Sequence, residues 1–228
     1  MSKPVIKVKD LHKIYDGAVP VKAVNGIDLT ITEGEFTALK GPSGCGKTTL
    51  LNMLGGLDAP TSGAIEVGGV DITKLSQNEL IDFRLRNIGF VFQAYNLIPV
   101  LSATENVSFI MLLQNRPKEE REQRARQLLQ SVGLTGKEDK RPGQLSGGQQ
   151  QRVAVARALA SKPQFVLADE PTANLDSEST ANLLDIMLKL NKEEGMTFVF
   201  ATHDDRVISK ARRVVAVSDG KIVSDTTK

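Results

Sequence analysis

Apolar and polar positions divide the chain into an N-terminal stretch with strand periodicity and a longer part in which strand and helix patterns alternate. Over residues 5–35, apolar side chains alternate with polar ones, which is typical of strands with one buried face. This stretch therefore predicts an antiparallel β layer. The longer part predicts an α/β core, because short apolar runs there are followed by stretches with helical spacing. The buried-strand candidates are residues 36–40, 88–92, 165–170 and 196–201.

Turn and capping residues mark where these elements begin and end. Two hairpins are predicted, one turning at Gly68-Gly69 and one at Asp219-Gly220. Capping-box spacing from Ser76 to Glu79 and from Ser102 to Glu105 predicts two helix starts. Helices are expected over residues 48–54, 76–86, 118–132, 150–160 and 177–194, with a further one from 102.

Residues 94–145 carry helix signals and no strand signal, so we interpret them as a helical subdomain inserted into the α/β core. The 228 residues suffice for one large domain with a sizeable core. We expect a single domain over residues 1–228. Residues 1–93 and 146–228 would form the α/β core with its antiparallel layer, and residues 94–145 would lead into the stretch that begins at Leu145.

Composition narrows the choice of partners. Charged residues make up 25% of the chain and the net charge is +2, so no strong field favours nucleic acid or anionic lipid. The single cysteine cannot form an internal disulfide, and the start of the chain lacks an apolar signal stretch. No apolar window is long enough to span a bilayer. We expect a cytosolic protein without direct membrane insertion, so that any membrane process would need a second polypeptide.

A phosphate loop joins the strand candidate 36–40 to the helix candidate 48–54. It fits the pattern G-x-x-x-x-G-K-[S/T] and consists of Gly41, Pro42, Ser43, Gly44, Cys45, Gly46, Lys47, Thr48 and Thr49. The glycines let backbone N–H groups turn toward phosphate oxygens, and the start of the helix attracts anions. Lys47 can reach the outer phosphates and Thr48 can offer a hydroxyl to Mg²⁺. The implied ligand is a nucleoside triphosphate. The alternative is that this sequence is only a glycine-rich turn before an ordinary helix.

Two further stretches could bind ligands, one through carboxylates and the other through backbone N–H groups. The strand candidate 165–170 ends in Asp169 and Glu170, and neighbouring side chains on a strand point to opposite sides. One carboxylate could then face Mg²⁺ and the other a water molecule. The second stretch consists of Leu145, Ser146, Gly147, Gly148 and Gln149. It reads as a capped helix start, but two glycines in the first turn cost helix stability and leave backbone N–H groups exposed to an anion.

Three other residues look ordinary when each is taken alone. Tyr15 reads as a half-buried turn tyrosine, Gln93 as the end of an apolar strand, and His203 as a structural or exposed histidine. Gln93 gains interest if its strand is parallel to strand 36–40, because ligands of open α/β sheets collect at the carboxyl ends of the strands.

Taken together and in this order, these features resemble the nucleotide-binding subunit of ABC transporters over residues 5–223. The most specific part is the stretch from Leu145 to Gln149, which matches the ABC signature. The resemblance implies an α/β fold with a phosphate-loop NTPase core, a mixed sheet, an N-terminal antiparallel β layer and an inserted α-helical subdomain. It also implies an ATPase that uses ATP and Mg²⁺.

The resemblance further assigns roles to residues. It implies that Tyr15 stacks on adenine, that the phosphate loop binds the phosphates, and that Thr48, Gln93 and Asp169 ligate Mg²⁺, Asp169 through water. Glu170 would polarise the attacking water and His203 would contact the γ-phosphate beside Lys47. The loop of Asn174, Leu175 and Asp176 would meet a second subunit.

Three stretches of the chain are similar to one branch of the family, which contains macrolide exporters, lipoprotein-releasing ATPases and the cell-division ATPase. The stretches that carry this similarity are residues 92–99, 105–107 and 167–172. Ala173 departs from the glycine that is common in that branch.

The implied assembly is a head-to-tail homodimer, in which Ser146, Gly147, Gly148 and Gln149 of one copy cap ATP bound to the other. We expect transmembrane permease subunits to bind near residues 93–107 and to hold the protein on the cytoplasmic face of the cell (inner) membrane. Two alternatives remain. One is a regulatory ABC ATPase that signals to cell-envelope or division machinery without transport. The other is a soluble ABC ATPase acting on nucleic acid or ribosomes, which the lack of a basic excess disfavours.

Overall fold

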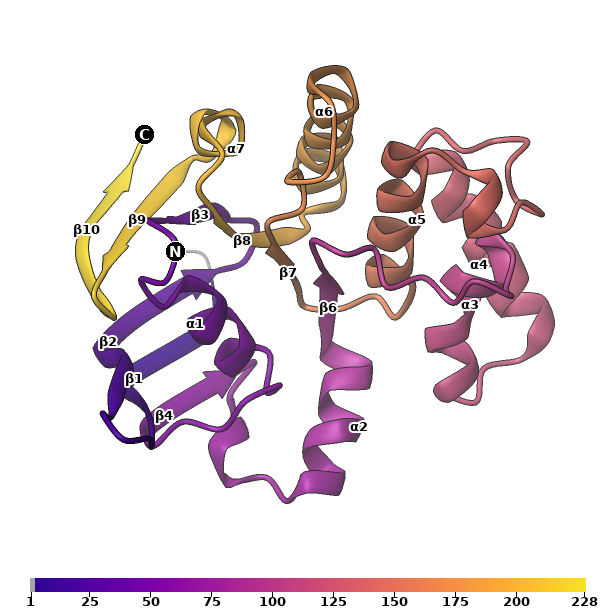
Figure 1. Ribbon diagram of the computed structural model, residues 1–228. Coiled ribbons are helices and arrows are strands. Elements are labelled where there is room, and N and C mark those ends of the chain that lie inside the picture. Colours follow the sequence, from indigo (N-terminus) through magenta and orange to yellow (C-terminus); the bar gives the residue numbers. More distant parts are fainter. Residues whose placement is uncertain (1–2) are drawn as a thin grey trace.

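Two β-sheets flanked by helices make up residues 3–228, the part of the chain that this computed structural model describes (Figure 1). The first sheet is antiparallel throughout, with the strand order β2-β1-β4-β5. Its strands are β1 (Pro4–Tyr15), β2 (Val21–Thr32), β4 (Ser62–Val67) and β5 (Val70–Asp71). The antiparallel layer and the hairpin that turns at Gly68-Gly69 are therefore confirmed.

The second sheet is mixed, as the fold class requires. Its order is β10-β9-β3-β8-β7-β6, and every neighbouring pair is parallel except β9 with β10. The strands are β3 (Phe36–Lys40), β6 (Ile88–Val91), β7 (Phe165–Asp169), β8 (Thr197–Thr202), β9 (Arg213–Ser218) and β10 (Lys221–Thr227). Because five strands run in the same direction, their carboxyl ends meet at one edge of the sheet.

Side chains of the parallel strands alternate between two buried faces. On one face, Phe36, Phe198 and Phe200 pack in a core with residues of the helices, and the rings of Phe36 and Phe200 lie 4.6 Å apart. On the other face, Leu39 and Val199 pack with the first sheet and with α1 (Lys47–Leu54). The sheet is thus packed on both faces.

The helices begin and end largely where capping residues predict. They are α1, α2 (Gln77–Asn87), α3 (Ala103–Leu113), α4 (Lys118–Ser131), α5 (Gly147–Ala160), α6 (Ser177–Glu194) and α7 (Asp205–Lys210), with short 3-10 turns η1 (Ile72–Lys74) and η2 (Pro142–Gln144). Capping boxes at Ser76 and Ser102 are confirmed. The helix expected over residues 150–160 begins earlier, at Gly147, and the capped start with Ser146 as cap and two glycines in the first turn is confirmed. Helix α7 was not predicted.

Helices α3, α4 and α5 lie side by side (Figure 1). No strand occurs between β6 and α5, a segment that the structure describes in full. Val107 and Leu128 pack into the same apolar cluster as Val153 of α5 and Phe198 of the sheet. The helical part therefore shares a continuous core with the sheet.

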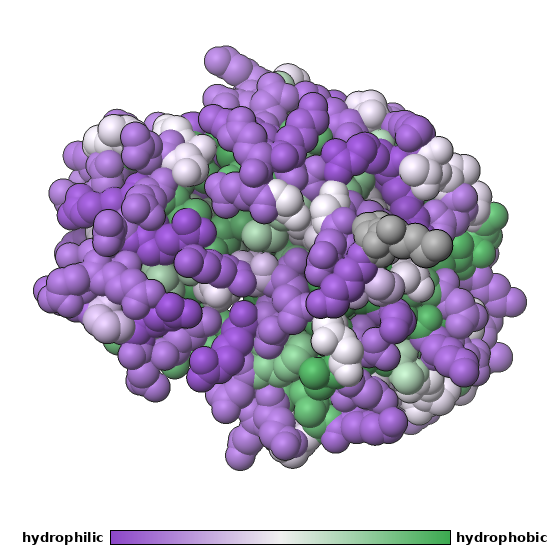
Figure 2. Space-filling view, turned by 180° about the vertical axis from the view of Figure 1, so that it is seen from behind, coloured by the Kyte–Doolittle hydropathy of each residue, from purple (hydrophilic) through white to green (hydrophobic). Residues whose placement is uncertain are grey.

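The face seen in Figure 2 is mostly polar, with apolar side chains showing in areas between polar ones. Within residues 3–228, no helix has both the length and the apolar character that crossing a bilayer requires.

Candidate active site

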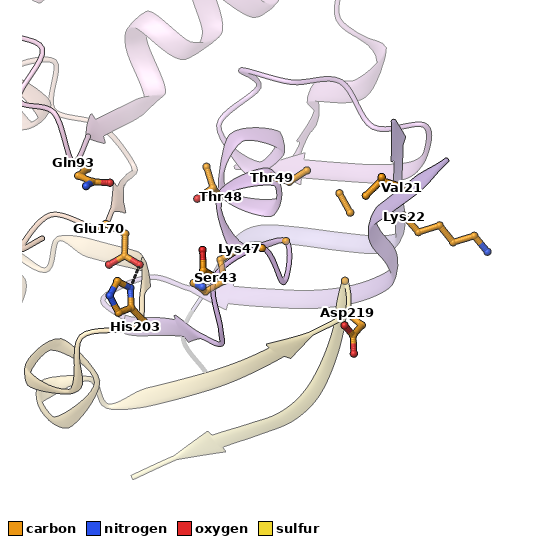
Figure 3. Close-up of a pocket in the computed structure, with 14 residues that line it drawn as sticks. Val21, Lys22, Ser43, Lys47, Thr48, Thr49, Gln93, Glu170, His203 and Asp219 are labelled. Carbon is orange, nitrogen blue, oxygen red and sulfur yellow. Dashed lines mark hydrogen bonds and ion pairs between the residues drawn. The ribbon is translucent and has the colours of Figure 1, made fainter. Parts of the chain in front are cut away.

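Residues that follow four parallel strands meet at the carboxyl edge of the second sheet. The phosphate loop follows β3, Gln93 comes shortly after β6, Glu170 follows β7 and His203 follows β8. All four face one cavity of about 710 Å³ (Figure 3). The side chains of Gln93, Glu170 and His203 lie across this cavity from the phosphate loop. The edge where ligands of open α/β sheets bind therefore carries the residues that the sequence selected.

Lys47 is folded into the phosphate loop. Its side chain is buried, with Nζ donating to the carbonyl oxygens of Gly41 at 2.7 Å and Pro42 at 2.9 Å. The N-cap of α1 is Gly46, which offers no side-chain acceptor to the first N–H groups of the helix. These free donors and the buried ammonium form a cradle that suits phosphate oxygens.

The back of the loop is closed by segments from other parts of the chain. The backbone amide of Gly220, in the β9–β10 turn, donates to the carbonyl oxygen of Cys45 at 3.0 Å. A Cβ atom on Gly46 would lie 2.1 Å from the carbonyl oxygen of Ala23, and one on Gly41 would lie 2.2 Å from that of Val217. The loop can approach β2 and β9 this closely only because both positions are glycine.

This packing predicts that Gly46→Ala destroys the loop. Gly46 has φ 104° and no room for a side chain, so alanine there adds a clash to the strain of a left-handed backbone. Gly34→Ala is the matched control, because Gly34 has φ 77° and nothing within 4 Å of its added Cβ. We expect Gly34→Ala to cost about 1–2 kcal/mol in urea unfolding. Gly46→Ala should cost more and abolish nucleotide binding by calorimetry, and equal effects of the two changes would contradict the packing argument.

Thr48 and Asp169 form the part of the site that suits a cation. Thr48 Oγ1 donates to Asp169 Oδ1 at 3.0 Å, and Gln93 lines the same cavity. Burial raises the pKa of Asp169, and the charge of Glu170 raises it further, against the opposing effects of Thr48 and Lys47. Residues 3–228 contain no cluster of three His, Cys, Asp or Glu side chains that could hold a metal unaided. This donor set fits Mg²⁺, which binds through one or two carboxylates and takes its other ligands from phosphates and water.

Glu170 and His203 contact each other directly. His203 Nδ1 lies 2.6 Å from Glu170 Oε1, and Thr202 Oγ1 donates to Glu170 Oε2 at 2.9 Å. The predicted division of tasks between Asp169 and Glu170 fits these separate partners, but strand alternation is the wrong reason for it. Strand β7 ends at Asp169, and Glu170 has φ 42°. A left-handed backbone turn separates the two carboxylates, and such strain gathers at functional sites.

The group behind Glu170 is itself anchored. The backbone amide of Asp204 donates to Thr202 Oγ1 at 3.0 Å, and Thr172 Oγ1 donates to Asp204 Oδ2 at 2.7 Å. Hydrogen bonds from Arg206 are the main reason why the pKa of Asp204 falls to about 2. The ionised carboxylate of Asp204 thus holds Thr172 and Arg206, and its backbone amide keeps the Thr202 hydroxyl aimed at Glu170.

Seven predicted contacts outside the phosphate loop do not line this cavity; one of them, Asp169, is linked to it through the hydrogen bond that Thr48 donates, and the other six lie elsewhere. The residues Ser146, Gly147, Gly148 and Gln149 begin α5, and Asp176 caps α6. Gly148 and Asp176 line a separate cavity of about 340 Å³, and Tyr15 lies at the end of β1. Packing within the chain also favours glycine at positions 147 and 148. A Cβ atom on Gly147 would lie 2.7 Å from Tyr95 Oη, and one on Gly148 would lie 2.8 Å from Ser179 Oγ.

Sequence reasoning missed one wall of the main cavity. Val21, Lys22 and Ala23 at the start of β2 line it together with Asp219 and Gly220. In Figure 3 the side chains of Lys22 and Asp219 point away from the phosphate loop, so this wall contributes mainly backbone. The Asp219-Gly220 turn was predicted as a hairpin, but nothing in its sequence indicates that it reaches the loop. Thr202 was missed as well, because a threonine at the end of a strand carries no distinct signal.

Comparison with known proteins agrees with this geometry. A family model described as ABC transporter matches residues 24–173. An uncharacterized ABC transporter ATP-binding protein of Thermotoga maritima is 47% identical over 96% of this chain and 94% of its own length. The macrolide export ATP-binding/permease protein MacB of Hyphomonas neptunium is 44% identical over 99% of this chain. The match spans only 35% of that MacB protein, about a third of its length.

Solved structures give the same result. A dimeric post-hydrolysis state of the ATP-binding cassette MJ0796, bound to ADP and Pi, has a TM-score of 0.89 and 41% identity, covering 97% of this chain and 98% of that one. The structure of cbiO1 from Clostridium perfringens, part of the ABC transporter complex cbiONQ, has a TM-score of 0.88 and 31% identity, covering 98% of this chain and 88% of that one.

Proposed function

The chain belongs to the ABC transporter family, and we propose that it powers a separate membrane permease of the macrolide-exporter or lipoprotein-releasing type. As a member of this family it is an ATPase that uses ATP with Mg²⁺. The observation that carries the proposal is that the phosphate loop and the Glu170–His203 pair meet at one cavity, where Thr48 donates a hydrogen bond to Asp169. Similarity to MacB proteins supports the type of permease, and the match to nearly the full Thermotoga maritima protein supports a separate one.

We assign the binding roles from the resemblance to the family, and Lys47, Thr48 and Gln93 line the cavity as those roles require. Lys47 and the loop amides would hold the phosphates, and Tyr15 would stack on adenine. Thr48, Gln93 and Asp169 would hold Mg²⁺, which supplies charge neutralisation at the phosphates when bound. In this chemistry the protein mainly positions groups and stabilises charge, because phosphoryl transfer needs little covalent help.

Glu170 is the proposed acceptor of the proton from the attacking water. One of its oxygens is held by Thr202 and the other by His203. A γ-phosphate beside His203 offers the imidazole a second partner, which would free one Glu170 oxygen for the water. The oxygen bonded to Thr202 would then keep the carboxylate in position.

A second copy of the chain would complete the site. Ser146, Gly147, Gly148 and Gln149 lie outside the main cavity, and their helix start would supply anion-binding N–H groups to ATP on the partner. Asp176, in the neighbouring cavity, would meet the same interface. Dimeric forms of the cassette MJ0796 support this arrangement. Residues 1–228 would act as one ATPase domain, with the helical part carrying the signature toward the partner.

An apolar groove is the proposed contact with the permease. It encloses about 360 Å³ between β6 and α3, beside the 93–107 segment, and its lining includes Phe90, Ile98 and Leu113. Arg157 closes one side and donates to the carbonyl oxygen of Tyr95 at 3.0 Å. Leu113 is 51% exposed, so the groove leaves apolar surface uncovered that a helix of the permease could bury.

Affinity purification from the membranes of the source organism tests this assignment. We expect an integral membrane protein to co-purify and to be lost when Leu113→Glu places a charge in the groove. Val223→Glu is the matched control. Val223 is also an exposed apolar residue, but it lies on the edge strand β10 and does not line the groove. Ribosomal proteins or nucleic acid in place of a membrane protein would favour the soluble alternative. Equal recovery with Leu113→Glu would remove the groove from the interface.

A further inference from the structure

Lys13, Tyr15 and Asp58 form a cluster at the rim of the main cavity, which we call the Tyr15 latch. Tyr15 Oη donates to Asp58 Oδ2 at 2.7 Å, and Lys13 Nζ donates to Asp58 Oδ1 at 2.7 Å. Lys13 Nζ also donates to the carbonyl oxygen of Ala59 at 2.7 Å. None of the three latch residues lines the cavity. The Tyr15 ring is therefore fixed by groups that stand behind the site.

The ring is next to the cavity wall. Tyr15 pairs with Val21 across the β1–β2 ladder, and Val21 and Thr49 both line the cavity. The Tyr15 side chain is 44% exposed at the end of its strand, where an unbonded ring would sample several rotamers. Holding such a side chain in one rotamer before a ligand arrives removes an entropic cost of binding.

Asp58 connects the ring to the helix that starts the phosphate site. It follows the C-terminal end of α1, and the backbone amide of Leu57 donates to the carbonyl oxygen of Asn52 at 2.8 Å. Since α1 begins at Lys47, one helix sets the positions of both the ammonium that meets phosphate and the carboxylate that holds the ring.

Lys13 adds a directional element. Its Nζ lies over the Tyr15 ring, 4.9 Å from the ring centroid, in a cation–π contact. The ammonium covers one face of the ring, so a planar base can stack only on the other face. Lys13 is mostly buried, with 14% of its side chain exposed, and this contact is better shielded from solvent than a surface ion pair.

We propose that Asp58 and Lys13 are positioning residues that preset the Tyr15 ring as a stacking face for the base of a nucleotide. They raise nucleotide affinity without touching the ligand. The inference rests on the proposed stacking role of Tyr15. It adds Asp58 and Lys13 to the site. Neither residue belongs to the phosphate loop, to the signature or to the ends of the parallel strands.

Charge at the latch agrees with this geometry. The hydrogen bond to Asp58 is the main cause that raises the pKa of Tyr15, so its phenol stays protonated and keeps donating. Burial raises the pKa of Asp58, but hydrogen bonds from Lys13 and Tyr15 outweigh burial and lower that pKa overall. The carboxylate therefore remains an acceptor throughout the neutral range.

Calorimetric titration with two probes, MgADP and magnesium pyrophosphate, tests the proposal. We expect Asp58→Asn and Lys13→Met each to weaken MgADP by about 3- to 10-fold, the scale of one immobilised side chain, and to leave pyrophosphate unchanged. Tyr15→Ala should weaken MgADP by about 5- to 100-fold, since base stacking on an aromatic ring is worth about 1–3 kcal/mol. Asp82→Asn controls for the charge change of Asp58→Asn and Lys9→Met for that of Lys13→Met, because Asp82 and Lys9 are exposed and form no ion pair within residues 3–228.

A second measurement reports on the ring without any nucleotide. The chain has two tyrosines, so ¹³C labelling at Cζ gives two resonances, and Tyr95→Phe assigns them. Asp58→Asn should shift the Tyr15 resonance and lower the pKa of its phenol. An unmoved resonance, or equal weakening of MgADP and pyrophosphate, would overturn the latch. If Tyr15→Ala leaves MgADP affinity unchanged, the proposed stacking itself fails; if only Asp58→Asn and Lys13→Met are silent, the stacking stands and the latch alone fails.

Discussion

Glu170→Gln is expected to slow ATP hydrolysis by about 10²- to 10⁴-fold, the usual scale for removing a general base, while ATP binding survives. Glutamine keeps the shape of the side chain, and its carbonyl oxygen can still accept the hydrogen bond that Thr202 donates to Glu170. It cannot take a proton from water. The phosphate loop and the Thr48–Asp169 pair are untouched by the change, which is why binding should persist.

The same variant should make the ATP-bound dimer isolable. If hydrolysis is what opens the dimer, a chain that binds ATP and does not hydrolyse it remains associated. Phosphate release at saturating MgATP and size-exclusion chromatography with ATP measure the two effects separately. Glu194→Gln is the control, since Glu194 is exposed at the end of α6. Full turnover by Glu170→Gln would refute its role as base, and a monomer in ATP would refute the dimer.

Local pattern predicted the elements of the core because each strand and helix is fixed by its own residues. The strand Phe36–Lys40 is apolar in the sequence and buried on both faces in the fold, and Ser76 caps α2 through its own side chain. The meeting of the site residues at one edge of the sheet also follows from the predicted strands. Once the strands are parallel, residues just after them share one edge, which brings Gln93 and His203 to the phosphate loop.

Features that depend on packing between distant segments could not be predicted in this way. The closure of the phosphate loop by Ala23 and Gly220 requires β2 and the β9–β10 turn to meet behind it. The left-handed backbone of Glu170 likewise follows from how β7 ends beside β8, with its amide donating to the carbonyl oxygen of Ala201. Asp58 gave no signal as a partner of Tyr15, because 43 positions separate the two residues.

Lys47→Met should weaken ATP binding by about 10²- to 10⁴-fold. Hydrogen bonds to charged groups contribute about 1.5–3 kcal/mol each, and an ammonium between two phosphates makes at least two of them. Methionine retains most of the buried stem of Lys47, so the change removes the charge with little loss of packing. Lys47→Ala would also leave a gap beneath the carbonyl oxygens of Gly41 and Pro42, and its effect would include distortion of the loop.

The comparison that isolates the charge is with Lys40→Met. Lys40 ends β3 immediately before the loop and its side chain is exposed, so the net charge falls equally while the cradle stays intact. Titration with a slowly hydrolysed ATP analogue should give near-normal affinity for Lys40→Met and a large loss for Lys47→Met. Because Lys47 already satisfies two loop carbonyls, part of the loss would be structural, and thermal unfolding without nucleotide measures that part. Unchanged affinity in Lys47→Met would remove Lys47 from the phosphate site.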